Sequence, residues 1–204
     1  MNKLEVWFEF ASTYSYLTVA RVEDVTQAEG VEIEWRPFLL GPIFRAKGWN
    51  TSPFVLDTTK GNYMWRDMER RAGRLGLPFS RPAVFPAHSL LAARTMTAAL
   101  KEPWCGSFAR DVFQAQFGSG KDISDQSVIR QILAAHVSDT ALWMELAQTD
   151  RVKSELRSNT DQALEIGIFG APSLRVGNEL FWGDDRLEDA IDWLKRTANT
   201  QSPA

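Results

Sequence analysis

β-strand periodicity occurs only near the two ends of this 204-residue chain. At the N-terminal end, residues 4–10 and 31–36 alternate bulky apolar with polar side chains, which predicts two strands. Between them, an amphipathic pattern predicts one helix that is capped by Ser12 or Thr13 and continues to about Glu29. This β-α-β order requires parallel strands with a right-handed crossover.

The C-terminal end carries the second group of strands. Residues 172–176 and 179–182 flank a Gly-Asn pair, which is typical of a β-hairpin. A final amphipathic helix is expected to begin at Asp184 or Asp185 and to end near Arg196. Strands that lie so far apart in sequence form one sheet only if the middle of the chain is an insertion.

The middle of the chain is expected to be helical. Residues 38–60 are rich in Gly, Pro, Ser and Thr and predict a long connection, whereas residues 61–167 predict five or six helices. The chain is therefore α/β with a large all-helical insert. The expected division is one discontinuous domain over 1–60 and 168–198, a helical insert over 61–167, and a disordered tail over 199–204.

Composition excludes several classes of protein. The formal net charge is −3, no basic stripe occurs, and 44% of the residues are hydrophobic, so we expect no nucleic-acid partner. No apolar run reaches about 18 residues and no signal-peptide pattern opens the chain, so we expect a cytoplasmic protein without a membrane span. Cys105 is the single cysteine, which rules out an intramolecular disulfide and any multi-cysteine metal site.

The junction of the first strand and helix carries the sequence Ser12-Thr13-Tyr14-Ser15. A helix N-terminus has unpaired backbone N–H groups and a partial positive charge, and a serine hydroxyl there can donate a further hydrogen bond to an anion such as a thiolate. Taken alone, Ser12 is better explained as an ordinary N-cap. Neither serine can take part in thiol–disulfide exchange, because that chemistry requires a thiolate.

Further segments give the junction a context. Together with it, they resemble the 2-hydroxychromene-2-carboxylate isomerases and kappa-class glutathione transferases of the DsbA-like family, over residues 4–196. The resemblance implies a thioredoxin-like fold, β-α-β followed later by β-β-α, with the helical insert between. The segments are residues 35–44, 48–50, 61–67, 167–173 and 180–187.

The resemblance implies a glutathione site that begins at Ser12. In this family the matching serine contacts the glutathione sulfur. Ala171-Pro172 matches the cis-proline loop, whose residue before proline pairs its backbone with the cysteinyl unit. Thioredoxin-like oxidoreductases carry Cys-x-x-Cys at this turn, where this chain has Ser12 and Ser15. The resemblance therefore implies that Ser12 donates a hydrogen bond to the thiolate of bound glutathione and is not itself the nucleophile.

The start of the last helix is the second part of this implied site. Asp185 matches the aspartate that receives the γ-glutamyl ammonium group, and Trp182, Gly183 and Asp184 match its backbone cradle. Relatives usually have Ser or Asn in place of Asp184, whose charge would repel the γ-glutamyl carboxylate. Three outcomes are open. The backbone N–H and Arg186 compensate for this repulsion, the thiol cofactor binds weakly, or the cofactor is not glutathione. Without the resemblance, the two aspartates would be helix caps.

Three residues fall near positions that hold the aromatic substrate in the isomerases. Arg45 could pair with the carboxylate of a pyruvate-like group, and Asn50 and His88 would lie beside it. The alternative is that Arg45 is a solvated loop charge and His88 a helix cap. Two departures from the family, Thr13 for proline and Glu9 for aspartate, remove no donor from the thiolate site.

Three functions are compatible with these residues. The first is a glutathione-dependent isomerase of 2-hydroxychromene-2-carboxylate or a related aromatic acid, with no metal. The second is a kappa-like glutathione transferase or peroxidase with the same thiolate site. The third is a non-catalytic thioredoxin-fold binding module. The resemblance also implies a homodimer.

Overall fold

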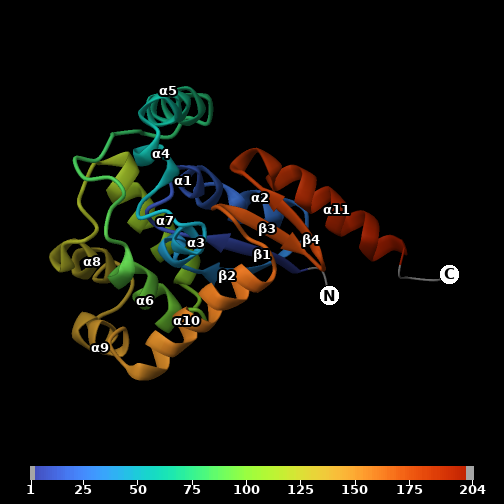
Figure 1. Cartoon of the computed structure of the whole chain (residues 1–204). Helices are drawn as coiled ribbons and strands as arrows, with labels where there is room; N and C mark the ends of the chain where they lie inside the picture. Colours follow the sequence, from blue (N-terminus) through green and yellow to red (C-terminus); the bar gives the residue numbers. More distant parts are fainter. Residues whose placement is uncertain (1–2, 201–204) are drawn as a thin grey trace.

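The computed structural model describes residues 3–200, with side chains described up to residue 198. One four-stranded mixed sheet forms the centre, in the order β2-β1-β3-β4. β1 is parallel to β2, whereas β3 is antiparallel to β1 and to β4 (Figure 1). The predicted β-α-β unit and C-terminal hairpin are therefore confirmed. The strands are β1 (Lys3–Phe8), β2 (Glu32–Pro37), β3 (Ser173–Val176) and β4 (Glu179–Trp182).

The first crossover contains two helices, and the prediction of one continuous helix was wrong. α1 (Thr13–Val19) ends at Ala20, and α2 (Val22–Ala28) begins after Arg21, whose φ of −130° is not helical. Arg21 turns out of the helix to reach the last helix, where it donates to the Asp184 carbonyl and pairs with Glu188. This tertiary contact explains the break, because helix propensity alone is a weak preference.

Residues 38–60 are more ordered than the composition predicts. They contain α3 (Leu40–Ala46), α4 (Pro53–Leu56) and the start of α5 (Thr58–Arg74). Two polar residues cap these helices: Ser52 accepts from the N–H of Phe54 at 3.3 Å, and Asp57 accepts from the N–H of Lys60 at 3.0 Å. Residues that suggest a loop here act as N-caps.

The predicted helical block is confirmed as all-helical, and no strand occurs between residues 61 and 167. α5 and α10 are its long members, and α10 returns the chain along one face of the sheet (Figure 1). A π-helical turn at Gln114–Gly118 extends α7. The remaining members are α6 (Leu90–Ala98), α7 (Cys105–Phe113), α8 (Gln126–Leu133), α9 (Thr140–Leu146) and α10 (Asp150–Glu165).

β1 is buried on both faces, so two apolar clusters flank the sheet. Trp7 packs on one side with residues of α3 and the end of α10. Val6 and Phe8 face the other side, where α1 and the final helix α11 (Leu187–Thr200) join a cluster that extends into α7 and α8. The sheet and the helical block share this core, so their division into two domains at residues 60 and 168 stays a prediction.

The last helix begins where the sequence predicts but extends further. A 3₁₀ turn at Asp184–Arg186 leads into α11, which continues past Arg196 to Thr200. A disordered tail starting at residue 199 was therefore wrong for residues 199–200, and residues 201–204 lie outside the described part of the chain. None of the helices described between residues 3 and 200 has the length and apolar character needed to cross a membrane.

Candidate active site

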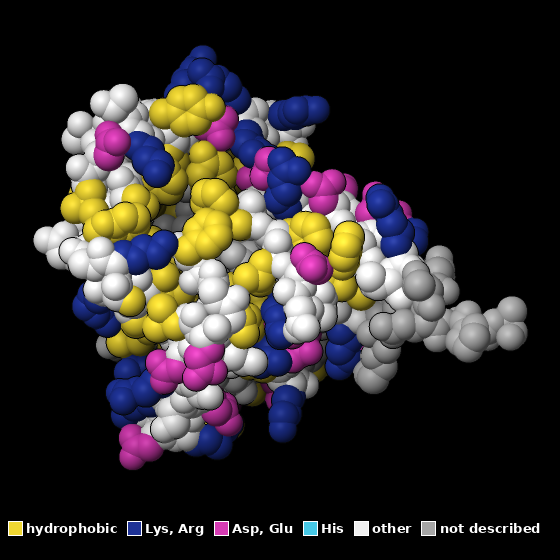
Figure 2. All heavy atoms as spheres, turned by 45° about the vertical axis from the view of Figure 1, so that its right-hand side comes forward, with side chains coloured by type: hydrophobic (Ala, Val, Ile, Leu, Met, Phe, Trp, Pro, Cys, Tyr) yellow, Lys and Arg dark blue, Asp and Glu magenta, His cyan; other side chains and the backbone are white. Residues whose placement is uncertain are grey.

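A cavity of about 600 Å³ opens beside the C-terminal end of β1. Its walls come from the turn into α1, the segment from α3 to α4, the loop before α6, and the loop before β3. Figure 2 shows hydrophobic side chains gathered around this hollow. Six of the predicted site residues line the cavity together: Ser12, Arg45, Asn50, His88, Ala171 and Trp182.

Ser12 is the N-cap of α1 and also touches the predicted cis-proline loop. Its Oγ accepts from the N–H of Ser15 at 3.3 Å and donates to the carbonyl of Ala171 at 2.8 Å. The Ala171–Pro172 peptide bond is cis. Ser12 is 9% exposed and lines the cavity, so a ligand reaches its hydroxyl from that side. The cap role and the cavity role therefore coexist in one side chain.

The short length of α1 changes the electrostatics expected at Ser12. A helix of seven residues aligns few peptide dipoles, so its N-terminus is a weaker anion site than the predicted long helix. Stabilisation of an anion here depends mainly on the Ser12 hydroxyl and the free N–H groups of the first turn. Ser15 contributes nothing, because its Oγ is fully buried without a hydrogen-bond partner.

Aromatic side chains form the rim of the cavity. Phe169 packs against Trp182 with ring centroids 4.9 Å apart, and the Lys47 ammonium lies 5.5 Å from the ring of Trp49 and 5.4 Å from that of Phe169. Gly170 permits this arrangement, since a Cβ there would come within 2.5 Å of Trp182 Nε1. A flat aromatic molecule fits such a rim, since stacking on ring faces is favourable.

The charges of the lining are mostly positive. Arg45, Lys47 and Lys60 line the cavity, and Glu9 is the single carboxyl group among the lining residues. Glu9 is 6% exposed, and this burial raises the pKa of its carboxyl group to about 6. Hydrogen bonds from Ser89 and Ala11 lower the pKa, but their effect is smaller than that of burial. Sequence reasoning treated Glu9 only as a tolerated departure.

The other predicted cofactor residues do not line the cavity. Pro172 is buried behind it, Asp185 is exposed beside it, and Gly183 has the positive φ of 120° that turns the chain into the last helix. Asp184 is buried at 1% exposure and points inward. The predicted repulsion between Asp184 and a bound γ-glutamyl carboxylate stays a prediction.

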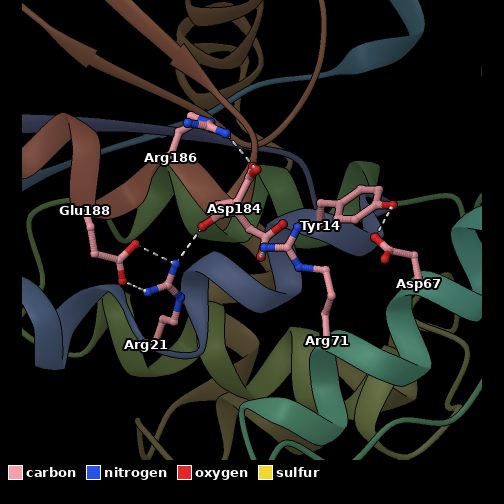
Figure 3. Close-up of polar contacts among 8 residues, drawn as sticks. Tyr14, Arg21, Asp67, Arg71, Asp184, Arg186 and Glu188 are labelled. Carbon is pink, nitrogen blue, oxygen red and sulfur yellow. Dashed lines mark hydrogen bonds and ion pairs between the residues drawn. The ribbon is translucent and has the colours of Figure 1, made fainter.

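The charge of Asp184 is balanced by Arg71 of α5, not by Arg186. Arg71 reaches toward Asp184 (Figure 3), with Arg71 Nη2 2.8 Å from Asp184 Oδ2, while Arg186 pairs with Asp185 and Asp189. Arg186 was one of the groups expected to compensate for Asp184, and it pairs with other carboxylates instead. The effect of Asp184 on a bound thiol stays a prediction. Among residues 3–200, neither carboxylate oxygen of Asp184 has a hydrogen-bond partner, so Arg71 contributes an ion pair alone. Burial, opposed by Arg71, raises the pKa of Asp184 to about 6.

A second polar contact joins α5 to the cavity wall. Tyr14 lines the cavity, and its hydroxyl donates to Asp67 Oδ2 at 3.0 Å. Burial and this carboxylate raise the pKa of Tyr14. Asp67 and Arg71 lie one turn apart on α5, so the partners of Tyr14 and Asp184 share one face of that helix (Figure 3). That spacing was the only sequence signal for Arg71, and it does not identify the partner.

The fold and the cavity define a class of protein. It is a thioredoxin-fold protein with a helical insert, in which an apolar cavity opens at the Ser12 turn between the first strand and the first helix. Among residues 3–200, no group of three side chains that bind metals comes together.

The chain belongs to the DSBA-like thioredoxin domain family, whose model matches residues 3–195. It is 28% identical to a 2-hydroxychromene-2-carboxylate isomerase of Sphingobium xenophagum, covering 94% of this chain and 97% of that protein. It is 25% identical to glutathione S-transferase kappa 2 of Caenorhabditis elegans, covering 94% and 91%. The solved structure of a 2-hydroxychromene-2-carboxylate isomerase superimposes with a TM-score of 0.87 at 24% identity, covering 98% of this chain and all of that one, so the two share a fold.

Proposed function

We propose that this protein is a glutathione-dependent isomerase of 2-hydroxychromene-2-carboxylate or a related aromatic acid. The observation that carries the proposal is the contact between Ser12 and Ala171 in the wall of a cavity with an aromatic, cationic rim. The name of the relative that is 28% identical over nearly the whole chain supports the same reaction. The proposal includes a cytoplasmic homodimer, whose size gel filtration would report.

The residues beside the cavity fit glutathione. The Ser12 hydroxyl can turn its hydrogen from the Ala171 carbonyl to a sulfur, which leaves that carbonyl free to accept from the cysteinyl N–H. Asp185 is exposed and suits an ammonium group. Asp184 is withdrawn and paired with Arg71, so it leaves the backbone of the turn as the cradle for the γ-glutamyl carboxylate.

Bound glutathione would supply a thiolate whose addition to and departure from a conjugated double bond permits rotation about that bond. Ser12 would stabilise the sulfur charge by donating a hydrogen bond, and the buried position strengthens that bond. Trp49, Phe169 and Trp182 would hold the flat ring and exclude water. Arg45 would orient the carboxylate of the acid.

Arg45→Met should weaken binding of the aromatic acid. Arg45 lines the cavity and makes no ion pair among the described residues, so its charge is free for a ligand. Loss of one carboxylate contact should raise KM about tenfold with a small change in kcat. Arg70→Met, which removes an exposed charge of α5 outside the cavity lining, is the matched control for charge, and calorimetry with glutathione should give the same affinity for both variants. A tenfold rise in KM for the control and none for Arg45→Met would contradict the assignment.

The reaction itself is tested by ultraviolet spectroscopy of 2-hydroxychromene-2-carboxylate with purified protein, with and without glutathione. The proposal requires conversion that depends on both. No acceleration by glutathione would refute it.

The kappa-class relatives support a transferase or peroxidase as the second candidate, because they are similar over the same length. Turnover of chlorodinitrobenzene or a hydroperoxide, without turnover of the chromene, would favour that reaction. Absence of both activities and of glutathione binding would instead indicate a binding module.

A further inference from the structure

The cavity contains one carboxyl group that the proposed function does not use. Glu9 follows β1 and lies three residues before Ser12, and both side chains line the cavity. The backbone of the turn ties them together, since the Ser12 N–H donates to the Glu9 carbonyl at 2.9 Å. The carboxyl group of Glu9 folds over this same turn, because its Oε1 accepts from the N–H of Ala11 at 3.1 Å.

The two oxygens of Glu9 have different surroundings. Oε1 accepts both from Ala11 and from the Ser89 hydroxyl, in a short contact, so the carboxyl group is held rigidly. Oε2 has no hydrogen-bond partner among residues 3–200, and it is not sealed from solvent as the oxygens of Asp184 are. One oxygen is therefore anchored in the wall, and the other is free at the cavity.

We propose that Glu9 is the proton acceptor of this site: its Oε2 takes the thiol proton of glutathione as the sulfur reaches Ser12, and returns it when the thiol leaves. The sulfur–hydrogen bond breaks, an O–H bond forms on Oε2, and the electron pair stays on sulfur. This inference rests on the proposed function. Oε2 is the only unpartnered carboxyl oxygen that the lining offers at the serine turn.

The charges around the cavity favour this exchange. Arg45 and Lys47 from the α3 segment and Lys60 from α5 line the cavity, and these cations stabilise whichever group is negative. His88 also lines the cavity, as does the ring of Tyr14, whose hydroxyl is already bonded to Asp67. Two negative groups close together repel, so a carboxylate beside a thiolate should hold one proton between them. Burial raises the pKa of Glu9 to about 6, so the empty site accepts a proton above that pH.

The number of protons released on binding distinguishes this role. At about pH 7.5, wild-type protein should form the thiolate, seen by its ultraviolet absorbance, with roughly no proton released, because Glu9 keeps it. Calorimetry of glutathione binding in buffers with different ionisation enthalpies counts that proton. In Glu9→Gln, which retains an acceptor for Ser89 and Ala11, thiolate should be lost or should appear with about one proton released.

The pH dependence gives a second measurement. Wild-type thiolate formation should decline as the pH falls through about 6, because Glu9 is then already protonated, whereas Glu9→Gln should lack this step. Glu179→Gln, on exposed β4, is the matched control and should behave as wild type. S-methylglutathione should bind without thiolate absorbance or a proton change in either variant.

Two results would overturn the assignment. One is the same thiolate yield and proton count in Glu9→Gln as in wild type, and the other is release of about one proton per thiolate by the wild type. In both cases glutathione still binds and the proposed function stands. Absence of glutathione binding to the wild type would instead overturn both proposals.

Discussion

Arg71→Met should lower the free energy of unfolding by about 3 kcal/mol at about pH 8. The substitution leaves Asp184 as a charge that is 1% exposed, with no hydrogen bond to either oxygen. Removal of one partner from a buried ion pair is among the most destabilising changes, because the remaining charge keeps its desolvation penalty. In a domain of this size that loss lowers Tm by roughly 6–12 °C.

The sign of the pH dependence follows from the raised pKa of Asp184. A carboxyl group whose folded-state pKa lies above its unfolded value destabilises the fold fully above the folded pKa, and this penalty shrinks as the pH falls from the folded towards the unfolded pKa. The pKa is about 6 with Arg71 present and should rise further without it. The deficit of Arg71→Met should therefore shrink as the pH falls from about 8 to about 5.

Urea unfolding at both pH values measures the effect, and two further variants isolate it. Arg71→Met with Asp184→Asn should recover most of the loss, since no buried charge remains. Arg66→Met removes an exposed pair with Glu69 on the same helix and should change stability by less than about 0.5 kcal/mol. A pH-independent deficit that persists in the double variant would mean that Arg71 acts by packing alone.

The sequence predicts those parts of the molecule that depend on local pattern. The β-α-β unit and the hairpin follow from period-two alternation and turn residues, and the final helix begins at the predicted aspartates. The break at Arg21 was not predictable, because it depends on contacts with Asp184 and Glu188 at the other end of the chain. The short helices in residues 38–60 were missed because Ser and Asp suggest a loop as readily as a cap.

The candidate site divides in the same way. Ser12 was predicted because it lies at a strand-to-helix junction and because further segments of the chain resemble a known family, and its role stays a prediction. Arg71 and Glu9 were missed because their roles come from the three-dimensional environment. Arg71 meets Asp184 only when the fold brings α5 beside the 3₁₀ turn that precedes the last helix, and Glu9 is held by Ser89 from a loop that precedes α6. Burial and a distant partner give such charges their importance, and neither property is visible in the residue type.

Ser12→Ala should lower the glutathione-dependent turnover by roughly 10²–10³-fold, the usual effect of removing one donor to a developing negative charge. The hydroxyl touches the Ala171 carbonyl and the N–H of Ser15, so the variant also loses a cap worth about 1 kcal/mol of stability. Glutathione affinity should change less, because its other contacts lie elsewhere in the site.

Ser15→Ala is the matched control for Ser12→Ala. It deletes a hydroxyl from the same turn, but that Oγ is buried without a partner, so both turnover and stability should stay close to wild type. Turnover, thermal unfolding and thiolate absorbance of bound glutathione should be measured on all three proteins. Equal turnover in the two variants would exclude Ser12 as the donor to sulfur. A loss of thiolate in Ser12→Ala alone would separate charge stabilisation at Ser12 from its second role as a helix cap.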